Sequence, residues 1–263
     1  MRATARHALK SWAGVGLLMS GWASAQGVDV EPLAGKVRSS VVEILGTVEG
    51  TDDTAYGTGF VFREKGLVVT NAHVVHGVRE PMVRTVDGAL LASVQVLYQH
   101  EEIDLAVLRV TGLGADPLPL AAGPPPAVGT PVVAIGHPRG YEFTVSTGIV
   151  SAHRSLDAGG PELIQITAPI SPGSSGGPLL DGEGRVVGVC SLTLTEGQNI
   201  NFAVPAAEIG PVIDQALSIE ASLGGAGTSS LPPETLARLA REQRESGELV
   251  RAAEMVRRAL ERH

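Results

Sequence analysis

The sequence predicts an all-β protein built from antiparallel barrels. About ten short stretches rich in β-branched residues follow one another between residues 37 and 204. The chain holds 33 Gly and 17 Pro among its 263 residues, a content that suits many tight turns. No helical pattern alternates with these stretches, so we do not expect the βαβ units of a parallel sheet.

Each predicted strand is apolar and is bounded by clusters of turn-forming residues. The strands cover residues 37–45, 56–62, 67–70, 90–98, 105–110, 132–135, 143–150, 163–167, 185–194 and 201–204. A proline run at 124–126 lies near the middle, where two halves of the β structure would join. Residues 26–36 show no clear periodicity. Residues 206–217 predict a helix whose middle Gly210 and Pro211 would weaken.

The N-terminus has the pattern of a signal peptide. Three basic residues precede a short apolar core at 12–22, and Ala23-Ser24-Ala25 supplies a cleavage site. We therefore predict a signal peptide over 1–25 and export to the periplasm or beyond the cell. The apolar core is shorter than the ~20 residues that span a bilayer, so no stable membrane span is expected after cleavage. The single cysteine, Cys190, leaves no internal disulfide, which suits a bacterial periplasm.

Three further segments are predicted after the signal. Residues 26–218 would form the β domain, and the Gly/Ser/Pro-rich stretch 219–233 a linker. Residues 234–263 read as two amphipathic helices. Their spacing resembles a single tetratricopeptide-like repeat, and an ordinary helical hairpin explains it equally well. Such a unit cannot bury its own apolar face, so it predicts docking on the barrels or self-association.

The charge balance narrows the range of partners. The formal net charge is −8 and the isoelectric point is near 5.4. A chain this acidic is not expected to bind nucleic acid as a general partner.

A glycine-rich run at 169–180 carries the strongest chemical signal. Ser175 lies there within Gly173-Ser-Ser-Gly-Gly-Pro178. Glycines let an exposed loop aim its N–H groups at a bound carbonyl oxygen, which favours a nucleophilic serine. The alternative is a tight turn of an all-β protein, and a base and an acid elsewhere in the chain would decide between the two.

His73 and Asp104 are the candidates for base and acid. His73 follows the apolar strand 67–70 closely, so the end of a strand would fix its position. Asp104 opens the strand 105–110, where a partly buried carboxylate needs a partner. The neighbouring Glu101 and Glu102 are expected to be solvated. His73 and His76 could instead pair on a metal, but no third ligand has a supporting spacing, so we expect neither a metal nor a cofactor.

Six short sequence motifs, taken in order along the chain, resemble those of the chymotrypsin-like serine peptidases. More narrowly, they resemble those of the HtrA/Deg group of exported bacterial proteases. They are Gly57-Thr-Gly-Phe-Val61, Thr70-Asn-Ala-His-Val-Val75, Asp104-Leu-Ala-Val-Leu108, Ala134-Ile-Gly-His-Pro138, Gly173 to Leu179, and Asn201-Phe-Ala-Val-Pro205. The resemblance covers about residues 37–217. It implies two perpendicular six-stranded β-barrels with the site in the cleft between them.

The same resemblance implies roles for individual residues. His73 would act as general base and then general acid, Asp104 would orient it, and Ser175 would attack the peptide carbonyl. The N–H groups of Gly173 and Ser175 would form the oxyanion hole.

Substrate preference follows only from the resemblance. Pro169 occupies the position where trypsin-type members carry an acidic pocket base, so cleavage after Lys or Arg is not expected. Ile170, Thr193 and Ile200 would line the pocket. They predict small or medium apolar residues such as Val, Ala or Ile before the cut.

The chain departs from the HtrA/Deg pattern at four places. Ser174 stands where Asn or Asp usually precedes the nucleophile, so activation by pairing with a freed amino terminus is not available. Thr167 replaces a frequent acidic residue. No segment after 217 is long enough for a PDZ domain. Residues 26–36 lack the aromatic residues with which many relatives form trimers.

These observations predict an exported serine endopeptidase that cleaves unfolded or misfolded polypeptides through an acyl-enzyme. The alternative from another class is a catalytically weak or inactive protease fold that serves as a peptide-binding or holdase module. An esterase that uses the same acyl-transfer chemistry is a third hypothesis.

Overall fold

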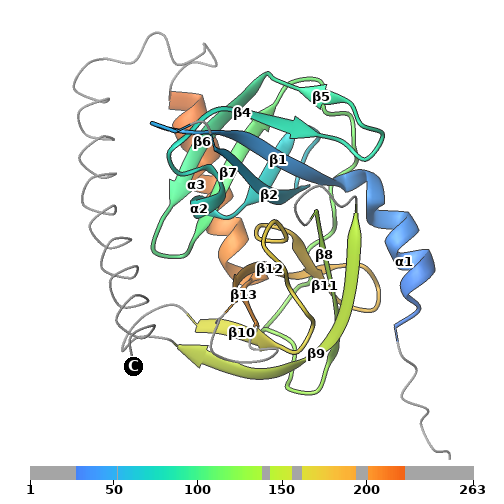
Figure 1. Cartoon of the computed structure of the whole chain (residues 1–263). Coiled ribbons are helices and arrows are strands. Elements are labelled where there is room, and N and C mark those ends of the chain that lie inside the picture. Colours follow the sequence, from blue (N-terminus) through green and yellow to red (C-terminus); the bar gives the residue numbers. More distant parts are fainter. Residues whose placement is uncertain (1–27, 52, 138–142, 156–161, 194–200, 223–263) are drawn as a thin grey trace, which may run out of the picture.

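The computed structural model describes residues 28–51, 53–137, 143–155, 162–193 and 201–222 (Figure 1). The predicted signal peptide at 1–25, most of the predicted linker and the predicted helical hairpin at 234–263 lie outside these residues.

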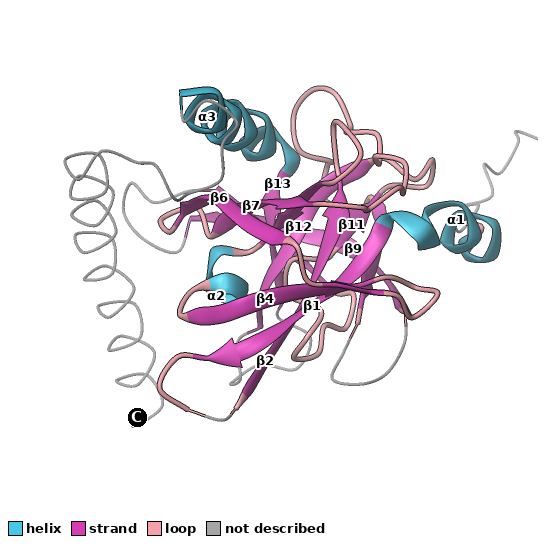
Figure 2. Cartoon of the chain, turned by 90° about the horizontal axis from the view of Figure 1, so that it is seen from above, coloured by secondary structure: helices cyan, strands magenta, loops and turns pink. Residues whose placement is uncertain are grey.

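The chain folds into two β halves, and the predicted chymotrypsin-like class is confirmed (Figures 1 and 2). The N-terminal half is one antiparallel sheet with the order β5-β4-β1-β2-β3-β7-β6. Its strands are β1 (Val41–Val48), β2 (Thr54–Val61), β3 (Leu67–Thr70), β4 (Val78–Arg84), β5 (Leu90–Leu91), β6 (Val94–His100) and β7 (Leu105–Val110). Because β4 and β6 touch each other, the sheet curls around its own core.

The C-terminal half is a closed six-stranded barrel with the order β10-β13-β12-β11-β8-β9. Its strands are β8 (Pro131–Gly136), β9 (Thr144–Ser155), β10 (Glu162–Ile166), β11 (Pro178–Leu180), β12 (Val186–Thr193) and β13 (Asn201–Pro205). The N-terminal half differs from the predicted six-stranded barrel by its seventh strand, the two-residue β5 at the edge.

Helices occupy the two ends of the described chain and the connection after β3. They are α1 (Val30–Val37), the 3-10 turn η1 (Arg38–Ser40), α2 (Ala72–Val75), the 3-10 turn η2 (Ala206–Glu208) and α3 (Ile209–Ser222). Among the described residues, no helix has the length and apolar character needed to cross a membrane.

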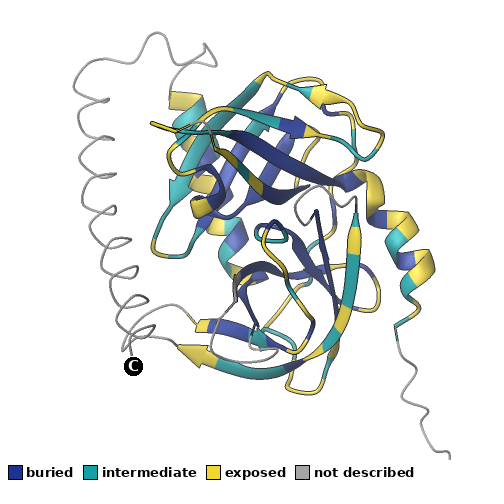
Figure 3. Cartoon of the chain, viewed as in Figure 1, coloured by how far each residue is buried: buried dark blue, intermediate teal, exposed yellow. Residues whose placement is uncertain are grey.

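Strands β3 and β7 of the N-terminal sheet are buried along nearly their whole length (Figure 3). On β7, Ala106 and Leu108 face the core inside the N-terminal half, whereas Leu105 and Val107 face a larger core shared by both halves. Strands β8, β11, β12 and β13 of the barrel contribute to that shared core, as do α1 and α3. Burial of one continuous apolar surface therefore holds the two halves against each other.

Helix α3 follows the C-terminal barrel but packs on the N-terminal sheet. It contacts β6 and β7, and its residues Ile209, Val212 and Ile213 are buried in the shared core. Arg109 of β7 forms a bidentate ion pair with Glu220 of the helix at 2.6 and 2.9 Å. The last described helix thus fastens the two halves together.

Several elements differ from the sequence prediction. Residues 30–37 form α1, whose Leu33 and Val37 are buried in the shared core. Strand β4 was missed because it contains Pro81 and is largely polar, and β11 because it has only three residues. Helix α3 begins at Ile209, which places Pro211 in the first turn, where its lack of an N–H costs nothing.

We predict that Ile213→Ala lowers the free energy of unfolding by about 2–5 kcal/mol, because it leaves a cavity at a fully buried position. Exposed Gln215 lies two residues further along the same helix, and Gln215→Ala serves as the control, with a change of about 0.5 kcal/mol or less. Urea denaturation measures both variants. Equal stability of the two would contradict the packing of α3 on the sheet.

Candidate active site

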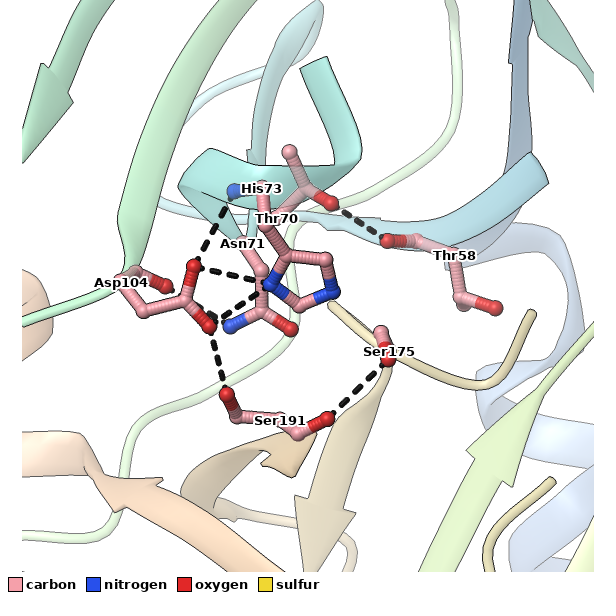
Figure 4. Close-up of polar contacts among 7 residues, drawn as sticks. All are labelled: Thr58, Thr70, Asn71, His73, Asp104, Ser175 and Ser191. Carbon is pink, nitrogen blue, oxygen red and sulfur yellow. Dashed lines mark hydrogen bonds and ion pairs between the residues drawn. The ribbon is translucent and has the colours of Figure 1, made fainter. Parts of the chain in front are cut away.

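His73 lies on the short helix α2, which begins directly after β3 (Figure 4). Its neighbours Ala72, Val74 and Val75 are buried, and they anchor the helix on the N-terminal core. The side chain of His73 is 47% exposed, so the imidazole faces outward from this anchored turn. The predicted end of a strand thus fixes the position of His73.

Asp104 closes the turn before β7, and its carboxylate meets His73. Both carboxylate oxygens lie 2.9 Å from Nδ1 of His73, and Oδ1 also accepts from the His73 backbone N–H at 3.1 Å. Asp104 has a φ of +57°, a left-handed conformation that Asp tolerates better than most residues. The side-chain amide of Asn71 donates to the Asp104 carbonyl at 2.8 Å and holds this turn.

Ser175 lies on the side of the imidazole ring away from Asp104 (Figure 4). Its hydroxyl donates to the carbonyl of Ser191 at 3.1 Å. Catalytic hydrogen bonds are often long or misaligned without substrate, so this contact describes a resting arrangement. The structure brings together the three residues that the sequence singled out from segments far apart in the chain.

Ser191, on β12, was missed by the sequence analysis. Its hydroxyl donates to Oδ2 of Asp104 at 2.5 Å, while its carbonyl accepts from Ser175. One buried residue of the C-terminal barrel therefore touches both the acid and the serine. In the sequence it is only a hydroxyl within an apolar strand, and nothing marks it as part of the site.

The loop before Ser175 leaves two N–H groups for a ligand. Ser174, Gly176 and Gly177 donate their N–H groups to the carbonyls of Ser171, Cys190 and Ser174. No acceptor for the N–H groups of Gly173 and Ser175 occurs in the part of the chain that the structure describes. Gly173 has a φ of +100°, which a residue with a Cβ rarely adopts.

The prediction that the side chain of Glu101 is solvated is wrong. Its side chain is only 4% exposed, and its carboxylate lies 3.5 Å from Nδ1 of His76, which immediately follows α2. The Glu101 carbonyl accepts from the N–H of Asp104, so the carboxylate belongs to the tight turn that carries Asp104. This turn folds back against the end of α2, and that contact buries Glu101. Glu102 is exposed, as predicted.

The predicted specificity pocket is only partly within the described residues. Ile170 is half-buried and packs against the core of the barrel, and Thr193 ends β12 opposite Asn201. Ile200 lies outside the described residues. Pro169 is exposed, and its carbonyl accepts from the hydroxyl of Ser146 at 2.6 Å.

A cysteine nucleophile and a bound metal ion are the two other chemistries that such a site could use. Burial raises the pKa of the Cys190 thiol to about 12, so this cysteine is a poor nucleophile. Within the described ranges, no three His, Cys, Asp or Glu side chains gather as metal ligands would.

A cavity of about 400 Å³ lies apart from the triad. It is lined mainly by the connection at 121–126, by Thr130 and Pro131, and by the turn at 181–185. None of His73, Asp104 and Ser175 lines it, so we do not assign it to the substrate.

The Asp104 carboxylate controls the charge of His73. Burial alone lowers the pKa of His73, but the hydrogen bond and the negative charge of Asp104 raise it, and the net pKa lies above the ordinary value of about 6.5. With Nδ1 turned to Asp104, Nε2 is the nitrogen left for proton exchange. The arrangement can take a proton from a hydroxyl and stabilise the resulting imidazolium.

The chain is similar to known serine peptidases over most of its described residues. The family described as "Trypsin-like peptidase domain" matches residues 57–189. Serine protease HTRA1 of Xenopus laevis is 39% identical over 59% of this chain and 35% of its own length. A protein of Hahella chejuensis named "Probable periplasmic serine endoprotease DegP-like" is 40% identical over 65% of this chain and 36% of its own.

Other relatives extend the similarity to plants and to solved structures. "Protease Do-like 1, chloroplastic" of Arabidopsis thaliana is 31% identical over 72% of this chain and 44% of its own. The active form of the Rv3671c protease from M. tuberculosis has a TM-score of 0.65 and 28% identity, covering 70% of this chain and 84% of that one. The chain spans less than half the length of these curated relatives.

We predict that the pKa of His73 lies above 6.5 in the free protein, because Asp104 stabilises the imidazolium more than burial disfavours it. Asp104→Asn removes the negative charge that favours the imidazolium, so the pKa of His73 should fall below that of the parent. NMR titration of the imidazole resonances measures both, with His73→Gln used to assign the signal. An unchanged pKa in Asp104→Asn would contradict the electrostatic role of Asp104.

Proposed function

Because the chain belongs to the trypsin-like peptidase family, we propose that it is a serine endopeptidase that uses Ser175, His73 and Asp104 as its catalytic triad. The observation that carries this proposal is the Asp104 carboxylate 2.9 Å from Nδ1 of His73, with Ser175 beyond the opposite side of the ring. This is the geometry that nucleophile, base and orienting acid require.

The acylation step follows from these positions. The hydroxyl of Ser175 turns from the Ser191 carbonyl towards Nε2 of His73, gives up its proton and attacks the peptide carbonyl carbon. The imidazolium that forms is stabilised by Asp104. The imidazolium then passes its proton to the departing amine as the C–N bond breaks.

The oxyanion and the second half of the reaction use the same groups. The N–H groups of Gly173 and Ser175 bind the negative oxygen of each tetrahedral intermediate. Water then enters, His73 takes one of its protons, and the hydroxide attacks the acyl-enzyme. The proton returns to Ser175 as the new carboxyl group leaves.

The substrates we propose are polypeptides, with unfolded or misfolded proteins as the natural class. Residues Ile170, Thr193 and Ile200 would line the pocket for the side chain before the cut. The absence of an acid at Pro169 supports apolar rather than basic residues there.

The cellular setting is part of the proposal. We place the enzyme in the periplasm or outside the cell, with the signal over 1–25 removed after Ala25. The support is the signal pattern in the sequence and the printed name of the DegP-like relative. Because α3 continues to Ser222, the β domain extends past its predicted end at 218 and the linker begins after that helix. A linker up to 233 and the hairpin at 234–263 complete the proposed organisation, with oligomerisation through the hairpin.

A peptide-binding module without catalysis is the alternative. The bond between His73 and Asp104 favours the enzyme, because a binding module has no need for an oriented base. Only Ser174 before the nucleophile favours the module.

We expect Ser175→Ala to reduce casein hydrolysis by residues 26–263 by about 10⁴-fold or more, because it removes the nucleophile. The parent should also react covalently with a fluorophosphonate, and the variant should not, as intact-mass spectrometry can measure. Equal inertness of parent and variant, without labelling, would support the binding module. Hydrolysis of activated esters without any cleavage of casein would support the esterase.

Pocket chemistry gives a second prediction. Peptides that differ only in the residue before the cut should be cleaved with kcat/KM at least about tenfold higher for Val, Ala or Ile than for Lys or Arg, because nothing acidic is expected at the pocket base. Mass spectrometry of the products identifies the bond that is cut. A preference for Lys or Arg would overturn the pocket assignment and leave the triad untouched.

A further inference from the structure

Thr58, on β2, is fully buried beside the nucleophile loop, and the sequence analysis gave it no role. Its backbone N–H donates to the carbonyl of Ser175 at 2.8 Å. Its own carbonyl accepts from the hydroxyl of Thr70 at 2.7 Å (Figure 4). The main chain of β2 is thereby bonded to the residue that carries the nucleophile.

The hydroxyl of Thr58 makes two further bonds. It donates to the carbonyl of Gly173 at 2.7 Å and accepts from the backbone N–H of His137 at 2.8 Å. A carbonyl can only accept and an N–H can only donate, so the direction of both bonds is fixed. One buried hydroxyl therefore connects the loop before Ser175 to the chain that leaves β8.

The Gly173 carbonyl is a fixed end of the backbone that carries the Gly173 N–H. The N–H and the carbonyl belong to consecutive peptide units that share the Gly173 Cα. With the carbonyl bound by Thr58, turning the N–H away by rotation about the N–Cα bond would change the observed φ of +100°. The loop has little room to shift beside Thr58. A Cβ on Gly176 would lie 2.1 Å from the Thr58 carbonyl oxygen and 2.2 Å from the Thr70 hydroxyl.

Position 174 provides no ionic anchor for this loop. Ser174 is half-buried, its N–H donates to the Ser171 carbonyl, and its Cα lies 2.7 Å from where a Cβ on Gly136 would be. It has no charge with which to pair an amino terminus. The bonds that fix the loop must come from elsewhere in the fold.

We propose that the Thr58 hydroxyl is a positioning group for the oxyanion hole, which it holds open by binding the Gly173 carbonyl. This proposal rests on the proposed function, in which the Gly173 N–H binds the oxyanion. Thr58 does not touch substrate. It acts through Gly173, and it makes the resting loop competent without an ionic partner at Ser174.

The test compares Thr58→Val, which keeps the shape but removes the hydroxyl, with Thr58→Ser, which restores it. Removing one oxyanion donor costs about 10²–10³ in kcat, and a group that positions such a donor should cost about 10–100-fold. We expect this loss in kcat for Thr58→Val, with KM and the His73-dependent pH profile unchanged. Thr58→Ser should recover kcat to within about threefold of the parent.

The matched control is Ser40→Ala, because Ser40 is also buried and its hydroxyl donates to the Asp116 carbonyl at 2.7 Å, away from the site. It should leave kcat unchanged. If Thr58→Val does not fold by circular dichroism, Thr58→Ala removes the hydroxyl without introducing a methyl group at its position. A folded variant without the hydroxyl that keeps kcat within threefold, or a Thr58→Ser as impaired as Thr58→Val, overturns the proposal.

Crystal structures separate this proposal from the protease assignment. The Gly173 peptide should leave its present conformation in Thr58→Val and keep it in Thr58→Ser, whatever the activity. A Gly173 φ that stays near +100° without the hydroxyl overturns the positioning role even in an active enzyme. A parent that neither cleaves casein nor reacts with the fluorophosphonate overturns the proposed function alone.

Discussion

The arrangement of the site depends on the carboxylate of Asp104, because it is hydrogen-bonded to residues of both halves of the molecule. It accepts from the backbone and ring of His73 within the N-terminal sheet, and from Ser191 of the C-terminal barrel. Both oxygens of this partly buried carboxylate therefore have hydrogen-bond partners. Any shift of one half against the other would break one of these bonds, so the packing between the halves directly affects the chemistry.

The shared core supplies the rigidity that this carboxylate needs. Strands β3 and β7 are buried along nearly their whole length, and β3 leads into His73 while β7 follows Asp104 directly. The base and the acid therefore border the two most completely buried strands of the N-terminal half, which pair with each other. Ser191 lies in β12, where residues 186–191 are buried as well. Buried strands thus fix the positions of His73 and Asp104, although both residues lie just outside those strands.

A site residue could be predicted from the sequence only where its neighbours in the chain reveal its role. His73 and Asp104 could be found because each borders an apolar strand, and Ser175 because glycines surround it. Ser191 and Thr58 could not, because each is a single hydroxyl inside a strand whose partner lies 87 or 115 residues away. The strand pattern predicted the fold class, but β4 and β11 were too polar or too short to detect. Glu101 was expected in solvent because its burial arises from the end of α2, which its own neighbours do not reveal.

Helix α3 has a consequence for the order in which the molecule is completed. Residues 209–216 cover the side of β6 and β7 that faces the shared core, although they belong to the last helix of the described chain to be synthesised. Until they emerge, Leu105 and Val107 lack part of their apolar cover, and the strand that follows Asp104 is incompletely packed. A growing chain that already contains His73, Asp104 and Ser175 therefore lacks a rigid site. Packing around the strand that follows Asp104 is therefore complete only when this last described helix is in place.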